Sequence, residues 1–150
     1  MNLKSLIVIS VFAVLFASCK KSTPVENEKS VHLVTLDPGH FHAALVQKSM
    51  YANVDSTVHI YAPEGPDLQL HLGRINGFNT RTESPTRWNE VIYSGENFFE
   101  KMLEEKAGNV VVISGNNLKK AEYISKSLDA GFNVLADKPM IIDAKDFETL

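Results

Sequence analysis

Residues 130–140 constrain the fold most, because they place a helix end, a short apolar strand and a Lys-Pro pair in one segment. Gly131 follows a helical pattern of apolar residues, and glycine most easily adopts the left-handed conformation that ends a helix. Residues 134–136 are apolar without polar alternation, which predicts a strand covered on both faces, as in a parallel sheet. Such sheets bind ligands beyond the carboxyl ends of their strands, so Lys138 is a candidate site residue.

The rest of the chain alternates between predicted strands and predicted helices. We expect strands at residues 31–36, 58–61, within 88–93, at 110–113 and at 134–136. We expect helices at residues 40–50, 67–75, 96–106 and 118–130, and the start of another at 144–150. The first helix is expected to turn four apolar residues toward the core: Phe41, Ala44, Leu45 and Met50. This alternation predicts an α/β fold with a Rossmann-like, doubly wound parallel sheet.

The sequence Ala-Gly-Phe-Asn-Val-Leu-Ala-Asp-Lys-Pro at residues 130–139 is more specific than the general pattern. It resembles the dinucleotide domain of the glucose-fructose oxidoreductase / inositol dehydrogenase (Gfo/Idh/MocA) family, which typically has Glu-Lys-Pro after an Ala-Gly-x-x-Val strand. The resemblance extends over roughly residues 31–150 and is stronger in the second half. It implies an NAD(P)-dependent oxidoreductase that transfers a hydride at a secondary alcohol of a sugar, cyclitol or related polyol.

The resemblance also implies site residues. In the family, the lysine of the motif lies near the nicotinamide and the substrate hydroxyl, where an ammonium stabilises an oxyanion or helps pass a proton. Lys138 is therefore the expected catalytic residue. Lys120 stands where the family usually has a histidine. Cofactor-binding roles are implied for Ser114, Asn116, Asn117, Asp137, Lys138 and Pro139.

The turn after the first predicted strand keeps one glycine of the Gly-x-Gly-x-x-Gly pattern. Gly39 is the middle glycine, whose missing side chain lets phosphates approach the backbone. Asp37 replaces the first glycine and would repel a pyrophosphate unless its carboxylate points away or caps the helix. His42 replaces the third glycine. We expect His40 and Phe41 to contact the cofactor beside Gly39.

The end of the second predicted strand should supply an acidic residue for the adenosine ribose hydroxyls. Glu64 is the candidate, and Asp67, which is also expected to cap the following helix, is the fallback. An acidic residue here favours NAD over NADP, whose 2′-phosphate it repels, although nearby arginines weaken this inference. We therefore expect NAD or NADP, with NAD favoured.

Two other features have both a functional and a structural interpretation. His40 and His42 offer two imidazoles to a metal ion, but positions i and i+2 of a helix face apart and no third ligand has supporting spacing. We therefore predict no metal site. Trp88 is expected in the core, with a wall of a sugar pocket as the alternative.

The first eighteen residues read as a targeting segment. Lys4 precedes an apolar run at residues 6–16, and small residues precede Cys19, which resembles a bacterial lipoprotein signal peptide. Cys19 would then be lipidated, and residues 19–30 would form a flexible tether. We expect a lipid-anchored protein of the cell envelope, in the outer membrane or facing the periplasm. The alternative is an ordinary secretory signal with a chance cysteine.

Length and charge limit the number of domains and the classes of partner. A chain of 150 residues allows one domain with a core, here residues 31–150. The formal net charge is −3, and there is no basic stripe with interleaved aromatics, which argues against a nucleic-acid partner. Family members continue into a second domain that binds the substrate and often forms the oligomer interface. We therefore expect a fragment that is inactive alone and becomes part of a homo-oligomer through that domain.

One competing interpretation belongs to a different functional class. The chain would be a non-catalytic, lipid-anchored binding module with a Rossmann-like fold that has lost its nucleotide. Asp37 and His42, which replace two glycines of the phosphate-binding turn, favour this interpretation. A third interpretation is a degenerate gene product without function.

Overall fold

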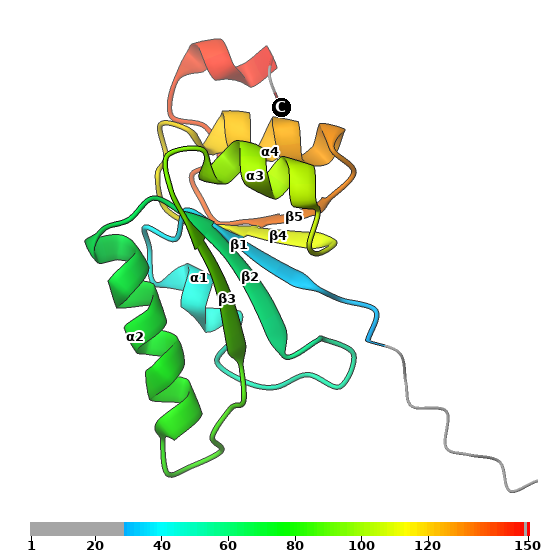
Figure 1. The fold of residues 1–150 in the computed structure, drawn as a ribbon. Coiled ribbons are helices and arrows are strands. Elements are labelled where there is room, and N and C mark those ends of the chain that lie inside the picture. Colours follow the sequence, from blue (N-terminus) through cyan, green and yellow to red (C-terminus); the bar gives the residue numbers. More distant parts are fainter. Residues whose placement is uncertain (1–28, 149) are drawn as a thin grey trace, which may run out of the picture.

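The structure is a computed structural model that describes residues 29–148 and residue 150. Within this part of the chain, five parallel strands form one sheet in the order β3-β2-β1-β4-β5, with helices on both faces (Figure 1). The strands are β1 (Leu33–Leu36), β2 (Thr57–Ala62), β3 (Asn89–Ser94), β4 (Val110–Ile113) and β5 (Asn133–Ala136). The helices are α1 (His42–Leu45), α2 (Pro66–Thr80), α3 (Phe98–Glu105), α4 (Lys120–Asp129) and the 3₁₀-helix η1 (Ala144–Glu148). The predicted Rossmann-like, doubly wound α/β fold is confirmed.

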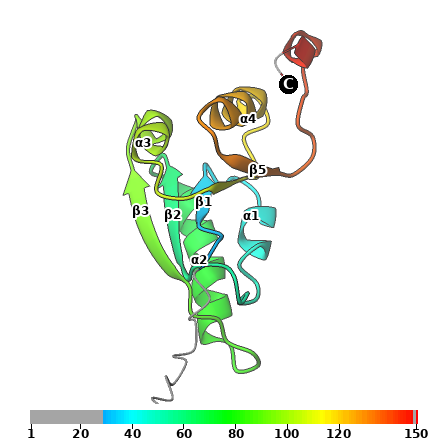
Figure 2. The same ribbon diagram turned by 90° about the vertical axis from the view of Figure 1, so that its right-hand side faces the viewer.

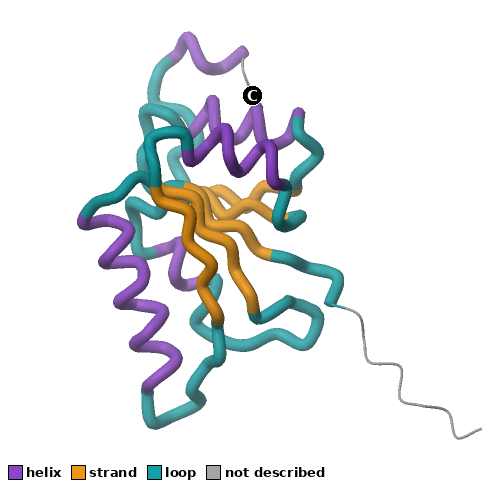
Figure 3. Tube along the Cα trace, viewed as in Figure 1, coloured by secondary structure: helices purple, strands orange, loops and turns teal. Residues whose placement is uncertain are grey.

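The central strands are buried on both faces of the sheet, because the helices form a layer on each side (Figures 2 and 3). Alternate residues of β1 enter different cores: Val34 faces α3 and α4, whereas Leu33 faces α1 and α2. The first core also contains Leu36, Phe98, Phe99, Met102, Val111, Ile113, Tyr123 and Ile124. The second core also contains Ala43, Ala44, Val58, Ile75, Trp88 and Val112. The continuous apolar runs of β1 and β4 therefore have the pattern of strands in a parallel sheet.

Helix α1 is much shorter than the helix predicted over residues 40–50. The N–H groups of Gln47 and Lys48 donate to carbonyls three residues earlier, so the chain leaves α1 through tight turns instead of further α-helix. Phe41 and Leu45 are consequently exposed, and their predicted place toward the core is wrong. Ala44 is buried as expected.

Helix α2 is longer than predicted and begins differently. Its first residue is Pro66 and its N-cap residue is Gly65, so the capping role expected for Asp67 is wrong. Asp67 lies in the first turn instead. The helix also continues through residues expected to form a polar loop, because Phe78 in its last turns packs against the core on the α1 side.

Strand β5 lies at an edge of the sheet as far as the structure describes it. It pairs with β4 only, and Leu135 is 49% exposed. The prediction that this strand is covered on both faces is therefore wrong. The apolar composition of the strand reflects its contact with α4 on one face, whereas Leu135 projects from the other.

No helix among the described residues is long and apolar enough to cross a membrane. The predicted signal peptide and Cys19 lie outside the described residues, so those predictions stay predictions.

A buried polar cluster joins the chain after α1 to strand β3. The indole N–H of Trp88 donates to the carbonyl of Gln47 at 2.6 Å, and the Gln47 amide donates to the carboxyl group of Glu90. Trp88 is 5% exposed, which confirms its place in the core. Burial raises the pKa of Glu90 to about 7, although the hydrogen bond from Gln47 acts in the opposite direction. Glu90 Oε2 is buried without a partner among the described residues.

We expect Glu90→Gln to flatten the dependence of stability on pH. In the wild type, the unfolded chain ionises near pH 4.5 while the folded chain keeps its proton until about pH 7, so stability falls as pH rises through this window. Glu90→Gln has no ionisable group at this position, so its stability does not fall for this reason as the pH rises. Urea unfolding at pH 5 and pH 8 measures it, and Glu83→Gln, at an exposed position, is the control. Parallel pH profiles for wild type and Glu90→Gln would contradict the prediction.

Candidate functional site

The candidate site lies at the carboxyl ends of β1, β4 and β5. The strand order reverses between β1 and β4, and open α/β sheets bind ligands in the crevice outside such a point. A cavity of about 350 Å³ lies between the turns that follow these strands. Most of the residues predicted to bind a cofactor line it: Gly39, His40, Asn116, Asn117, Asp137 and Lys138.

The other predicted site residues lie around this cavity or away from it. Ser114 is buried beneath the cavity and donates to the Asp137 carboxylate. Glu64 lines a different cavity on the β2 side. Phe41 and Pro139 are exposed and are not among the lining residues of the larger cavity. The Phe41 ring packs against the His40 ring, with centroids 4.5 Å apart.

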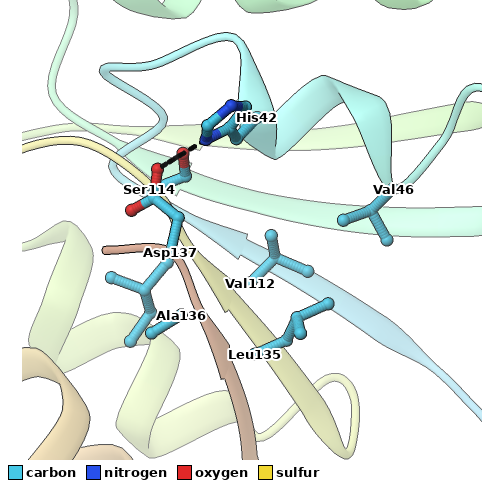
Figure 4. Close-up of a pocket in the computed structure, with 8 residues that line it drawn as sticks. His42, Val46, Val112, Ser114, Leu135, Ala136 and Asp137 are labelled. Atoms are coloured by element: carbon cyan, nitrogen blue, oxygen red, sulfur yellow. Dashed lines mark hydrogen bonds and ion pairs between the residues drawn. The ribbon is translucent and has the colours of Figure 1, made fainter. Parts of the chain in front are cut away.

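Asp137, the first residue after β5, is the centre of the site. Its Oδ2 accepts a hydrogen bond from Ser114 Oγ at 2.8 Å and lies 3.1 Å from His42 Nδ1 (Figure 4). Its Oδ1 accepts a hydrogen bond from the ammonium of Lys120. Burial raises the pKa of Asp137, but the hydrogen bonds from Lys120, Ser114 and His42 outweigh this and lower it to about 2. Asp137 is therefore a carboxylate with a fixed orientation.

Lys120 is a residue of the candidate site whose pairing could not be recognised from the sequence. It was recognised only as the replacement of a family histidine, yet its side chain is completely buried and pairs with Asp137. The available signal was its position beside Ala121 in the apolar pattern of the predicted helix, where a lysine needs an acidic partner. The partner was not apparent because Asp137 lies 17 residues away.

We expect Lys120→Met to destabilise the fold by about 3 kcal/mol, because it leaves the partly buried Asp137 carboxylate without its cation. The matched control is Lys126→Met on the same helix, which removes an exposed pair with Glu122 and should leave the unfolding midpoint nearly unchanged. Urea denaturation of both variants measures the difference. Equal midpoints for the two variants would show that the Lys120–Asp137 pair contributes nothing.

Asp37 connects the turn after β1 to the β4–α4 region. Its Oδ2 accepts hydrogen bonds from the Asn116 amide at 2.6 Å and from the Tyr123 hydroxyl at 3.1 Å. Burial and the neighbouring Asp37 carboxylate raise the pKa of Tyr123 above its ordinary value. Asp37 makes no capping bond to α1, so of the two alternatives for its carboxylate the capping role is wrong. No sequence pattern indicates this contact of Tyr123.

Gly39 approaches another backbone segment closely, and that segment is the turn after β4. A Cβ atom on Gly115 would lie 2.5 Å from Gly39 Cα, and Gly115 has a φ of 110°. In addition, the N–H of Gly39 donates to the Asp37 carbonyl, and the N–H of His40 donates to the Ser114 carbonyl. Two backbone donors of the turn are therefore engaged within the protein instead of facing a phosphate group.

We expect Gly115→Ala to cost at least about 2 kcal/mol, from strain at positive φ together with the clash against Gly39. Gly131→Ala is the matched control, because Gly131 also has a positive φ, of 90°, but an added Cβ there meets nothing within 4 Å. Its cost should be about 1 kcal/mol, from backbone strain alone. Denaturant unfolding of both variants tests this, and a Gly131→Ala loss as large as that of Gly115→Ala would contradict the close contact.

A smaller cavity of about 100 Å³ lies between the ends of β1 and β2. Its lining includes three acidic residues, Asp37, Glu64 and Asp67. The Asp37 carboxylate is bonded to Asn116 and Tyr123, which leaves the carboxylates of Glu64 and Asp67 as acceptors. Carboxylates accept hydrogen bonds from hydroxyl groups and repel phosphates. Among the parts of a dinucleotide, this cavity therefore fits the ribose. Hydrogen-bond donors for the phosphates would have to come from the larger cavity, which Asn117 and Lys138 line.

An apolar cavity of about 180 Å³ lies next to His42 and Asp137, between α1 and β5. Figure 4 shows Val112 and Leu135 below His42 and Asp137, with Val46 to the right. The site thus combines an apolar wall with a fixed carboxylate, as small-molecule sites commonly do.

Two histidines face the same carboxylate oxygen. The Nδ1 atoms of His40 and His42 lie 3.5 Å and 3.1 Å from Asp137 Oδ2. From the sequence, both histidines are expected within one helix, and no third ligand has supporting spacing. In the structure α1 begins only at His42, so the rule that i and i+2 face apart does not apply. The structure also brings a third ligand-type group, Asp137, from 95 residues away.

The chain matches no family model and no curated protein. It matches the crystal structure of a protein from Parabacteroides merdae ATCC 43184 that is named a "putative oxidoreductase". The two chains are 57% identical with a TM-score of 0.80, and the match covers 83% of this chain. This chain spans 28% of its neighbour's length. The neighbour's name fits an oxidoreductase family, as the sequence resemblance implied.

Proposed function

We propose that the chain is the NAD(P)-binding domain of an oxidoreductase of the Gfo/Idh/MocA family. Its substrate would be a sugar, cyclitol or related polyol. The observation that carries the proposal is the position of Lys138, which lines a cavity at the switch point of a Rossmann-like sheet. The Asp-Lys-Pro motif and the name of the 57%-identical neighbour support the same conclusion. This chain spans 28% of that neighbour's length. The oxidoreductase activity is therefore proposed for a whole protein that contains this domain.

Each end of the proposed cofactor would meet different residues. Glu64 and Asp67 would accept hydrogen bonds from the adenosine ribose, because they line the acidic cavity after β2. Asn117 and Lys138 would face the phosphates and the nicotinamide, since both line the larger cavity. When bound, the nicotinamide supplies or accepts the hydride. Lys138 would stabilise the negative charge that develops on the substrate oxygen, and Asp137 would hold its neighbouring turn in place.

The charge around the smaller cavity favours NAD over NADP. Its carboxylates would repel a 2′-phosphate, which NADP carries and NAD lacks. The guanidinium of Arg81 donates to the carbonyls of Lys48 and Ser84, at 2.7 Å and 2.6 Å. It is therefore already engaged and is not a ready partner for a 2′-phosphate.

The proposal also includes the location and the assembly of the protein. Cys19 would carry a lipid that anchors the domain to the cell envelope, in the outer membrane or facing the periplasm. A second domain would bind the substrate and form a homo-oligomer. These parts rest on the signal-like residues 1–18 and on the family resemblance.

A second candidate function is favoured by the turn after β1. The N–H groups of Gly39 and His40 are bonded within the protein, and α1 has only four residues. Both features weaken the usual phosphate site at this turn. The second candidate is therefore a non-catalytic, lipid-anchored binding module with a Rossmann-like fold.

Cofactor binding distinguishes the two candidates. We expect denaturation of the purified full chain to release NAD(H), detected by mass spectrometry, and calorimetric titration to show tighter binding of NAD⁺ than of NADP⁺. Glu64→Gln should weaken NAD⁺ binding about tenfold, through loss of a charge-assisted hydrogen bond to ribose. Glu83→Gln is the control on the exposed surface. A folded chain that neither releases nor binds a dinucleotide would favour the non-catalytic module.

A further inference from the structure

We propose that His40, His42 and Asp137 form a binding site for a divalent transition-metal ion of the Zn²⁺ class. One ligand atom from each residue lies within 4.8 Å of the other two. The two Nδ1 atoms lie 3.5 Å and 3.1 Å from the same oxygen, Asp137 Oδ2. Ligand atoms that share a Zn²⁺ at about 2.0–2.2 Å are separated by roughly 3.0–3.5 Å. The two distances to Asp137 therefore match those of ligands around one ion.

The carboxylate ligand is held in place as carboxylates are in metal sites. Ser114 Oγ donates to Oδ2, and the buried Lys120 donates to Oδ1, so neither oxygen is free to turn away. Hydrogen bonds of this kind orient metal ligands before the ion arrives. Each Asp137 oxygen can accept more than one partner, so Oδ2 keeps a lone pair for a metal ion beside the bond from Ser114.

A simple ion pair does not account for the arrangement of the two histidines. Lys120 already supplies a positive charge to Asp137, so charge balance requires neither imidazole. Burial does not force the imidazoles together either, because their side chains are 45% and 39% exposed. Their rings nevertheless meet edge to face, with centroids 4.3 Å apart, and direct both Nδ1 atoms at one oxygen.

The ligand types select the ion. Two imidazole nitrogens and one carboxylate oxygen suit Zn²⁺, Co²⁺, Ni²⁺ or Fe²⁺, whereas Mg²⁺ and Ca²⁺ take oxygen ligands. The same three residues line the cavity of about 350 Å³, so further coordination positions would face that cavity and hold water or a ligand oxygen. Three protein ligands with an open position are typical of catalytic zinc sites. The charge of Lys120 lowers the affinity, so we expect weaker binding than in a four-ligand structural site.

The proposal does not depend on dinucleotide binding, and its test contains no dinucleotide. The purified full chain is freed of metal with a chelator and titrated with Co²⁺ and Zn²⁺ by calorimetry, while visible absorption reports the coordination of Co²⁺. We expect one equivalent to bind, with a Kd of about micromolar, and a higher unfolding temperature with the metal than without it. His40→Ala, at an exposed position, should weaken binding at least tenfold without loss of the fold, and His42→Ala, whose side chain is 39% exposed, should do the same.

The controls are two other potential ligands of the chain. His32→Ala changes an exposed histidine at the opposite end of β1, and Cys19→Ser removes the lone cysteine; both should bind metal as the wild type does. Absence of metal binding by the wild type would overturn the proposal. So would undiminished binding by His40→Ala, or loss of binding in Cys19→Ser. A chain that binds NAD⁺ but no metal would overturn this inference and leave the proposed function intact.

Discussion

The candidate site depends on the buried ion pair between Lys120 and Asp137. Lys120 is fully buried at the start of α4, and Asp137 follows β5, so the pair joins two elements at the edge of the sheet. Removing two charges from water is costly, and such a pair is favourable only when further hydrogen bonds satisfy it. Ser114 and His42 supply those bonds. The pair thus fixes the carboxylate around which the other functional groups lie.

The second constraint is the contact between the turns after β1 and β4. Gly39 and Gly115 pack backbone to backbone, and Asp37 accepts a hydrogen bond from Asn116 across the same junction. The missing side chain of Gly39, which usually lets a phosphate approach the backbone, here lets the backbone of Gly115 approach instead. A dinucleotide at this site would therefore depend more on side chains such as Lys138, and less on backbone amides, than in the usual Rossmann arrangement. The acidic cavity after β2 still offers acceptors suited to a ribose.

The two proposed ligands share one cavity but need different chemistry. A dinucleotide uses the crevice across the switch point, whereas a metal ion uses the three ligand atoms around Asp137 Oδ2. Asp137 therefore takes part in both proposals, as the residue that fixes the turn before Lys138 and as a metal ligand. Val46, Val112 and Leu135 form an apolar wall on one side of this carboxylate.

The sequence by itself determined the order of strands and helices, because periodicity and helix-ending residues act over a few positions. It predicted β4 at residues 110–113, the apolar face of α3 and the helix end at Gly131, and it placed Asp137 and Lys138 at a strand end. Tertiary structure alone decided that α1 is a single short turn and that β5 is an edge strand within the described residues. It also decided which residues meet Asp137, because His42 and Lys120 reach it only through the β1-β4-β5 pairing. That pairing brings His42 to Asp137, 95 residues away, and no local pattern records which strands become neighbours.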